Sequence, residues 1–209
     1  PFSLTLPAEG LVLYCKPAQD GTSIGDCPFC QAIRILLEEL NLEYDLRPTT
    51  PENKPQWLLD QYDGKLPALR HDKECYVESE VILSYLLFFF GKDKLESKDN
   101  GEAQVNALFP ALAQYLKHTP AGDVQDQEKL SNLRTALSSM QDHLGDQEYW
   151  CGSEMTLADC RLAPRLYHLT TGCQAFKADY FDFAKEFPAL HAYSQRLFAR
   201  DSFQATQYP

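Results

Sequence analysis

Cys27 is the residue of this chain best placed to act as a nucleophile. It stands directly before Pro28, in the stretch Gly25-Asp26-Cys27-Pro28-Phe29-Cys30. Apolar residues then recur at helical spacing as far as Leu40, so Pro28 opens a helix and the sulfur lies beside the unpaired N–H groups at its start. Those donors and the helix macrodipole stabilise an anion. We therefore expect a thiolate at this position, with a pKa of about 3.5–7.5 rather than about 8.5.

Cys30 lies one helical turn after Cys27 and on the same side, so the two sulfurs could form a disulfide. Such a Cys-x-x-Cys pair has three interpretations. A zinc site would need a second pair of Cys or His residues at short spacing, and neither the other cysteines nor the histidines supply one. Inert, half-buried thiols are the ordinary outcome for cysteine in a helix, but the polar Asp26 places this helix end within reach of solvent. The sequence favours a redox-active pair and no metal site.

The composition argues against two classes of partner. The 209 residues carry a net charge of −11, which repels nucleic acid and anionic membrane surfaces at long range. The longest apolar run, residues 85–90, is far too short to cross a bilayer. We therefore expect no nucleic-acid partner and no membrane insertion.

The cysteines and the first residues bear on the compartment. Seven cysteines is an odd number, and apart from the Cys27/Cys30 pair they are scattered, unlike a secreted disulfide framework. Residues 1–10 show no secretory signal. We expect a reducing compartment, either the cytoplasm or a plastid, and no secretion.

The segments on either side of the cysteine pair predict a βαβ unit. Residues 11–15 are a β-favouring run, and residues 43–47 alternate as a second strand. Strand, helix and strand at this length imply a parallel pair with a right-handed crossover, and place the cysteines at the carboxyl end of the first strand. Lys16 follows that strand, so it lies near the thiolate or the substrate, or it is an ordinary solvated loop lysine.

A bend at Pro67 is expected at the start of the third strand. Residues 55–59 predict a short helical piece, and Leu66-Pro67-Ala68-Leu69 follows a Gly-Lys turn. A proline there can stand only on a free edge or at a bend, and a cis Leu66–Pro67 bond is one solution. Such a bend would leave the Leu66 backbone free to pair with a peptide-like ligand.

The following residues complete a first domain. Residues 71–74 predict a hairpin turn, residues 75–77 a fourth, antiparallel strand, and Glu78-Ser79 the start of a helix. Ser79 is a simple N-cap, or its N–H groups receive a carboxylate while Glu78 meets an ammonium group. The order βαβ then ββα, with Cys-x-x-Cys after the first strand, is a thioredoxin-like pattern.

A polar stretch, residues 91–101, predicts a linker between the domain of residues 1–90 and a second domain of residues 102–209. The second domain is helical throughout. Its apolar periodicity predicts helices over residues 105–116, 130–144, 156–169 and 188–197.

The helix that begins at residue 156 carries a recognisable start. Thr156 and Asp159 have the spacing of a capping box. Tyr167 and His168 in the same helix are expected to be packing residues, as helical residues of these types usually are. The first domain is therefore expected to supply the chemistry.

Several motifs resemble one family. A thioredoxin-like domain followed by a helical domain, whose central helix opens at Thr156-Leu157-Ala158-Asp159, resembles the glutathione transferase superfamily. Within it, the closer resemblance is to the dehydroascorbate reductases of plants and algae. That resemblance is carried by Gly25-Asp26-Cys27-Pro28-Phe29, Asn53-Lys54-Pro55-Gln56-Trp57, Gly64-Lys65-Leu66-Pro67, Ala163-Pro164-Arg165-Leu166-Tyr167-His168-Leu169, Phe187-Pro188 and Asp201-Ser202-Phe203.

The resemblance implies a glutathione transferase fold, an α/β thioredoxin-like domain followed by an all-α domain. It implies ping-pong reduction of dehydroascorbate to ascorbate, with Cys27 as the catalytic thiol and Asp26 and Lys16 placing dehydroascorbate and moving protons. Glutathione is then a co-substrate rather than a resident cofactor, and no metal or nucleotide is needed. We expect a monomer. The residues expected to bind glutathione are Lys54, Leu66, Pro67, Glu78 and Ser79.

The plant members of this family carry Ser at the position of Cys30. Cys30 therefore departs from the family pattern and is a candidate resolving thiol. The alternative enzyme is an omega-like glutathione thiol transferase or deglutathionylase, using Cys27 on mixed disulfides. The chain also resembles chloride intracellular channel proteins, which share the Cys-Pro-Phe start. An interaction protein of that kind would need a membrane-inserting segment, and residues 35–50 are too acidic to suggest one.

Overall fold

The structure, a computed structural model, describes residues 10–91, 95 and 101–208. The chain forms two compact units, Pro1–Lys92 with Thr206–Pro209, and Asp93–Ala205. Most of the predicted linker, residues 92–94 and 96–100, lies outside the described residues. Thr206, Gln207 and Tyr208 belong to the first unit by their contacts, although the sequence predicted them to be part of the helical domain.

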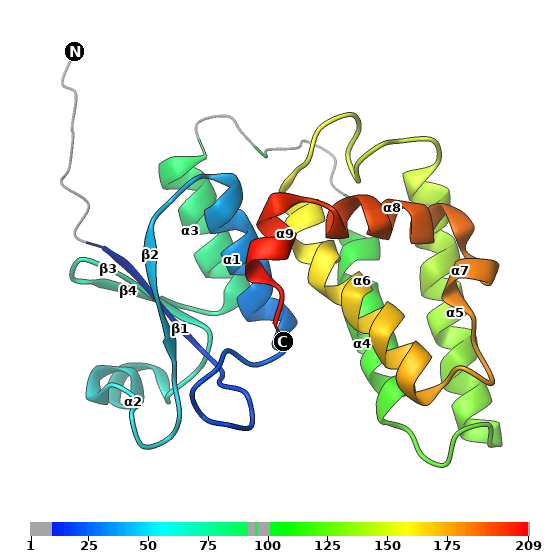
Figure 1. The fold of residues 1–209 in the computed structure, drawn as a ribbon, viewed down its shortest axis with the longest axis horizontal. Coiled ribbons are helices and arrows are strands. Elements are labelled where there is room, and N and C mark those ends of the chain that lie inside the picture. Colours follow the sequence, from blue (N-terminus) through cyan, green and yellow to red (C-terminus); the bar gives the residue numbers. More distant parts are fainter. Residues whose placement is uncertain (1–9, 92–94, 96–100, 209) are drawn as a thin grey trace. The chain divides into compact units, whose positions relative to one another are not determined.

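The first unit is built on a mixed sheet (Figure 1), with the strand order β2-β1-β3-β4. Strands β1 and β2 pair in parallel, and the other neighbours are antiparallel. The predicted βαβ and ββα order is confirmed. The elements are β1 (Leu11–Cys15), α1 (Pro28–Glu39), β2 (Tyr44–Pro48), α2 (Gln56–Tyr62), β3 (Ala68–His71), β4 (Glu74–Val77) and α3 (Ser79–Phe90).

Alternation along β1 decides which helices cover each face of the sheet. Val12 and Tyr14 pack against Leu58 of α2 and its flanking aromatic residues. Helices α1 and α3 contact each other and lie on the opposite side of the sheet from α2, as Figure 1 shows. Residues that point to that side, such as Leu13, are fully buried. Burial of each such side chain stabilises the fold by about 1.5–3 kcal/mol.

The expected bend at Pro67 is present. The Leu66–Pro67 peptide bond is cis, and β3 begins only at Ala68, after the proline. Strand β3 lies between β1 and β4 rather than at an edge. Pro67 therefore stands outside the ladder, and its missing N–H costs the central strand no hydrogen bond.

The second unit is helical, as predicted. The sequence analysis missed α7 and α9, which are too short to show apolar periodicity. The helices are α4 (Glu102–Lys117), α5 (Val124–Leu144), α6 (Leu157–Phe176), α7 (Phe183–Glu186), α8 (Pro188–Phe198) and α9 (Asp201–Thr206). The last residue of α9, Thr206, belongs to the first unit.

The predicted capping box opens α6. The Thr156 side chain and the Asp159 carboxylate bond reciprocally to the backbone. The fully buried Asp159 carboxylate also accepts hydrogen bonds from the Trp150 backbone N–H, at 2.8 Å, and from the Tyr193 hydroxyl, at 2.6 Å. Tyr167 packs edge-on against the rings of neighbouring phenylalanines. The interpretation of Tyr167 as a packing residue is confirmed.

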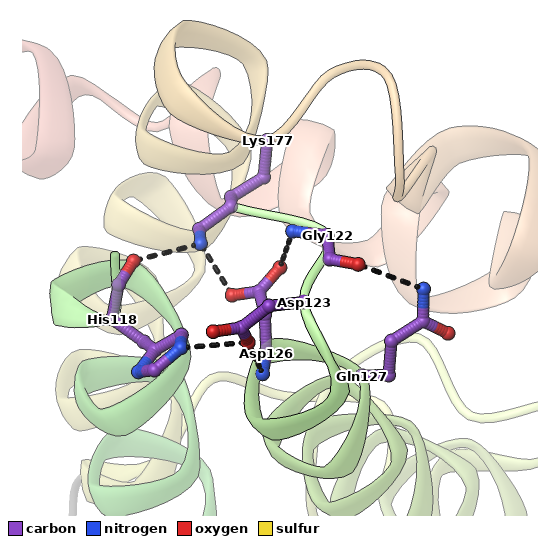
Figure 2. A network of polar contacts seen from close by, with 6 residues as sticks. All are labelled: His118, Gly122, Asp123, Asp126, Gln127 and Lys177. Carbon is purple, nitrogen blue, oxygen red and sulfur yellow. Dashed lines mark hydrogen bonds and ion pairs between the residues drawn. The ribbon is translucent and has the colours of Figure 1, made fainter. Parts of the chain in front are cut away.

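A buried ion pair ties the end of α6 to the start of α5 (Figure 2). The Lys177 ammonium is paired with the Asp126 carboxylate, and both side chains are almost fully buried. Lys177 also donates to the His118 carbonyl, and Asp126 accepts from the Gly122 backbone N–H at 2.8 Å. The His118 ring is in turn paired with the Asp123 carboxylate through its Nε2 atom. Each buried charge is hydrogen-bonded, so this network fixes the connection between α4 and α5.

Within the described ranges, no helix is long and apolar enough to span a membrane.

Candidate active site

Cys27 is the N-cap residue of α1, and Pro28 occupies the first turn. This is the arrangement that the sequence predicts, because proline needs no hydrogen-bond partner at that position. The Cys27 side chain is half-buried and makes no capping hydrogen bond. It nevertheless faces the start of the helix, where the N–H groups of Phe29 and Cys30 favour its anion. The described cysteines are all free thiols.

Two buried thiols lie on the inner side of Cys27, one behind the other. Cys30, at 1% exposure, lies beside it, and Cys15 at the end of β1, at 0%, lies beside Cys30. The Cys30 thiol and burial raise the pKa of Cys27, and the backbone N–H groups of Cys30 and Phe29 lower it by less. In this reduced arrangement the pKa is therefore raised, contrary to the value expected from the helix start alone. A neighbouring thiol was not included in that expectation.

Gly25 brings the residues after β1 close to Cys27. Its backbone N–H donates to the Lys16 carbonyl at 2.9 Å. A Cβ atom at this position would lie 2.6 Å from the Pro17 carbonyl oxygen, so no other residue fits without displacing the backbone. Glycine therefore allows Lys16 and Asp26 to lie side by side at the mouth of the site.

Lys16 and Asp26 line a pocket of about 520 Å³, together with loop residues between them and Tyr208. Both charged side chains are exposed. Asp20 shapes this loop by accepting hydrogen bonds from the backbone N–H groups of Thr22 and Ser23, each at 2.8 Å. Tyr208 was not predicted to belong to the site. It lies far along the chain from this loop, and no sequence pattern indicates a contact between the two.

The strand register brings three of the predicted glutathione-binding residues, Leu66, Pro67 and Glu78, to the same end of the strands. Tyr14 lies opposite Ala68, so the residues before Ala68 continue beside the end of β1, next to Lys16. Ala68 also lies opposite Val77, which places Pro67 level with Glu78. Within the described residues, no hydrogen bond uses the backbone of Leu66. That edge is therefore open to a peptide-like ligand.

The remaining predicted residues differ in their surroundings. The Lys54 ammonium donates to the Gly64 carbonyl at 2.8 Å and so supports the turn before Leu66. Glu78 is the N-cap of α3, with a φ of 67° in the left-handed region, and Ser79 is the first helical residue rather than the cap. Strain of this kind concentrates at functional sites.

Glu78 also has a partner that the sequence analysis did not foresee. Its carboxylate accepts a hydrogen bond from the Lys65 ammonium at 2.9 Å, and both side chains are more than half exposed. The carboxylate raises the pKa of Lys65. In the described ranges, no group of three or more His, Cys, Asp or Glu side chains is arranged to hold a metal ion.

The family models match both units of the chain. The N-terminal domain of glutathione S-transferases matches residues 23–91, and the C-terminal domain matches residues 125–196. Individual proteins are also similar to this chain over most of its length.

A crystal structure of Chlamydomonas reinhardtii dehydroascorbate reductase is 28% identical, with a TM-score of 0.81, over 97% of this chain and 94% of that chain. Glutathione S-transferase DHAR3, chloroplastic, of Arabidopsis thaliana is 29% identical over 186 residues, 88% of this chain and 70% of that protein. Probable glutathione S-transferase DHAR1, cytosolic, of Oryza sativa subsp. japonica is 28% identical over 188 residues, 88% of this chain and 85% of that protein. The chain belongs to the glutathione transferase superfamily, as its motifs indicated.

Proposed function

We propose that this chain is a glutathione-dependent dehydroascorbate reductase. The observation that carries the proposal is the half-buried Cys27 thiol at the start of α1, directly after Asp26, which lines a pocket together with Lys16. Its relatives among the dehydroascorbate reductases support the same assignment.

The proposed reaction proceeds in two halves. In the first, the Cys27 thiol gives two electrons to dehydroascorbate; the sulfur takes an oxygen from water and becomes a sulfenic acid, and dehydroascorbate takes two protons and becomes ascorbate. In the second, the thiol of one glutathione attacks the sulfenic acid, forming a mixed disulfide and releasing water. The thiol of a second glutathione attacks that disulfide, which releases oxidised glutathione and restores Cys27.

The pocket supplies charges that suit this chemistry. The Lys16 ammonium, which lines the pocket, favours the ascorbate anion over neutral dehydroascorbate. Asp26 is placed to carry protons between the pocket and solvent, since its carboxyl is exposed at the mouth. A lysine here also compensates locally for the net charge of −11, which would otherwise repel anions.

Glutathione fits the edge beside Leu66 and Pro67. Its peptide backbone pairs with the backbone of Leu66, which lies before β3 and outside the strand ladder. The N-terminus of α3 at Ser79 receives a carboxylate, and Glu78 receives the ammonium group after releasing Lys65. Lys54 supports this edge through Gly64. Glutathione is thus a co-substrate, and the scheme uses no resident cofactor.

We propose the cytoplasm or a plastid as the compartment, which is the expectation from the sequence. Named relatives include one chloroplastic and one cytosolic protein, and both compartments supply glutathione in reduced form. We propose a monomer, which light scattering of the purified protein tests.

The test is glutathione-dependent reduction of dehydroascorbate, followed through the absorbance of ascorbate. Wild-type protein should turn over rapidly and Cys27→Ser should be inactive, because serine cannot form the mixed disulfide. Cys75→Ser is the matched control, since Cys75 is also a half-buried free thiol of the first unit. Slow turnover by both wild type and Cys27→Ser would overturn the proposal and direct the search to glutathionylated disulfides.

A further inference from the structure

The segment after α9 returns to the first unit and is held there. The Arg34 guanidinium on α1 donates to the Thr206 carbonyl at 2.9 Å, and both residues are buried. A hydrogen bond from a charged donor in a buried place is among the stronger contacts in a protein. This contact anchors the chain two residues before Tyr208 to α1, the helix that follows the Cys27 N-cap.

Tyr208 completes the pocket beside the catalytic thiol. The other residues that line this pocket belong to the loop 16–26. Tyr208 is half-buried and is one of the residues that line the pocket. A volume of about 520 Å³ lies within the usual range for small-molecule sites. The pocket thus has an ammonium, a carboxylate and a phenol around one space.

The phenol adds an aromatic ring, which none of the loop side chains around the pocket has, and a second neutral donor beside the Gln19 amide. Lys16 is a charged donor that acts on anions, and Asp26 only accepts when ionised. A tyrosine hydroxyl is a neutral donor, and its ring is a flat apolar surface. Such a group recognises a neutral, compact molecule that carries adjacent carbonyl groups and hydroxyls.

We propose that Tyr208 is a substrate-binding residue that sets the preference of this site for a small polyoxygenated oxidant. Its hydroxyl donates to a carbonyl oxygen of dehydroascorbate while its ring covers one face of the molecule. The inference rests on the proposed function, because dehydroascorbate is the oxidant it invokes.

The test compares Tyr208→Phe with wild type in the ascorbate assay. Loss of one hydrogen bond to a neutral group should raise the KM for dehydroascorbate by roughly 2- to 10-fold, with the KM for glutathione unchanged. Reduction of 2-hydroxyethyl disulfide, which offers no carbonyl, should be unaffected. Tyr180→Phe is the matched control, because it removes the same hydroxyl from a partly exposed tyrosine of the second unit.

A second readout needs no turnover. Ascorbate in the pocket should protect Cys27 from iodoacetamide, and Tyr208→Phe should need several-fold more ascorbate for the same protection. Unchanged KM and unchanged protection in Tyr208→Phe would overturn the inference and leave the proposed function intact. A wild type that reduces 2-hydroxyethyl disulfide but not dehydroascorbate, without protection by ascorbate, would overturn both.

Discussion

Arg34 on α1 donates a hydrogen bond to the main-chain carbonyl of Thr206, at a distance of 2.9 Å and across 172 residues of sequence. Arg34 lies about two helical turns after the Cys27 N-cap, so the same helix presents the thiol and holds the segment that carries Tyr208. This contact joins an element of the first unit to residues near the other end of the chain.

The first prediction concerns that contact. Arg34→Met should destabilise the fold by about 1.5–3 kcal/mol, the usual contribution of a hydrogen bond to a charged group. If Arg34 positions Tyr208, the KM for dehydroascorbate should rise while reduction of 2-hydroxyethyl disulfide stays unchanged. Thermal melts and the two assays measure these effects. Equal losses with both substrates would show a purely structural role.

The second prediction concerns the thiol next to Cys27. The Cys30 thiol is the largest cause that raises the pKa of Cys27. Removing a cause that raises a pKa lowers it, so Cys30→Ala should move the pH profile of Cys27 alkylation by iodoacetamide to lower pH. Mass spectrometry of the alkylated protein identifies the modified residue. A shift to higher pH would show that Cys30 instead stabilises the thiolate by donating its S–H.

The third prediction concerns Cys30 in turnover. Cys30→Ser should keep most of the reductase activity, because glutathione itself resolves the oxidised Cys27 in the proposed scheme. Comparable losses in Cys30→Ser and Cys27→Ser would contradict this and make the site a dithiol one. Steady-state rates at saturating glutathione give the comparison.

The fourth prediction uses the exposed pair of Lys65 and Glu78, joined at 2.9 Å. Such exposed pairs contribute about 0–1 kcal/mol, so glutathione can displace Lys65 at little cost. Glu78→Gln should raise the KM for glutathione by roughly 3- to 10-fold, because it replaces a charge-assisted hydrogen bond with a neutral one, a difference of about 1 kcal/mol. Lys65→Met, in contrast, should leave it unchanged or lower it. A rise of the same size in both variants would mean that the pair itself holds the site together.

Local patterns made much of this architecture predictable. The start of α1 at Cys27 follows from Pro28 and the apolar spacing after it, and the capping box of α6 follows from Thr156 and Asp159. Each of these features is decided by residues within one or two helical turns. The order of strands and helices along the chain followed in the same way, with the strands predicted from short, β-favouring runs.

Contacts between distant residues were not predictable in this way. Tyr208 lines a pocket with the loop after β1, and the chain two residues before it is held by a hydrogen bond from Arg34 to Thr206. The raised pKa of Cys27 depends on the Cys30 thiol and on burial, and the pKa of Cys30 is in turn raised by Cys15 of strand β1. Sequence spacing identifies the groups that could react, whereas their electrostatic surroundings depend on packing.

The fifth prediction concerns the buried pair of Lys177 and Asp126 in the second unit (Figure 2). Lys177→Met would leave a buried carboxylate without its partner, which costs about 3–5 kcal/mol. Adding Asp126→Asn to that variant removes the unpaired charge and should recover part of the loss. Urea unfolding at neutral pH measures each free energy. A double variant no more stable than Lys177→Met would place the cost in packing rather than in charge.

The same pair gives a dependence of stability on pH. Burial raises the pKa of Asp126, but hydrogen bonds from Lys177 and Gly122 lower it by more, so the net pKa in the fold lies below its usual value. Protons therefore bind more strongly to Asp126 in the unfolded chain, and the stabilisation is present above about pH 4 and is lost as the pH falls through the folded-state pKa. Asp126→Asn has no such proton to bind. The difference in unfolding free energy between wild type and Asp126→Asn should shrink between pH 5 and pH 2, roughly the range in which the carboxyl titrates, and a constant difference would exclude this carboxylate as a source of acid sensitivity.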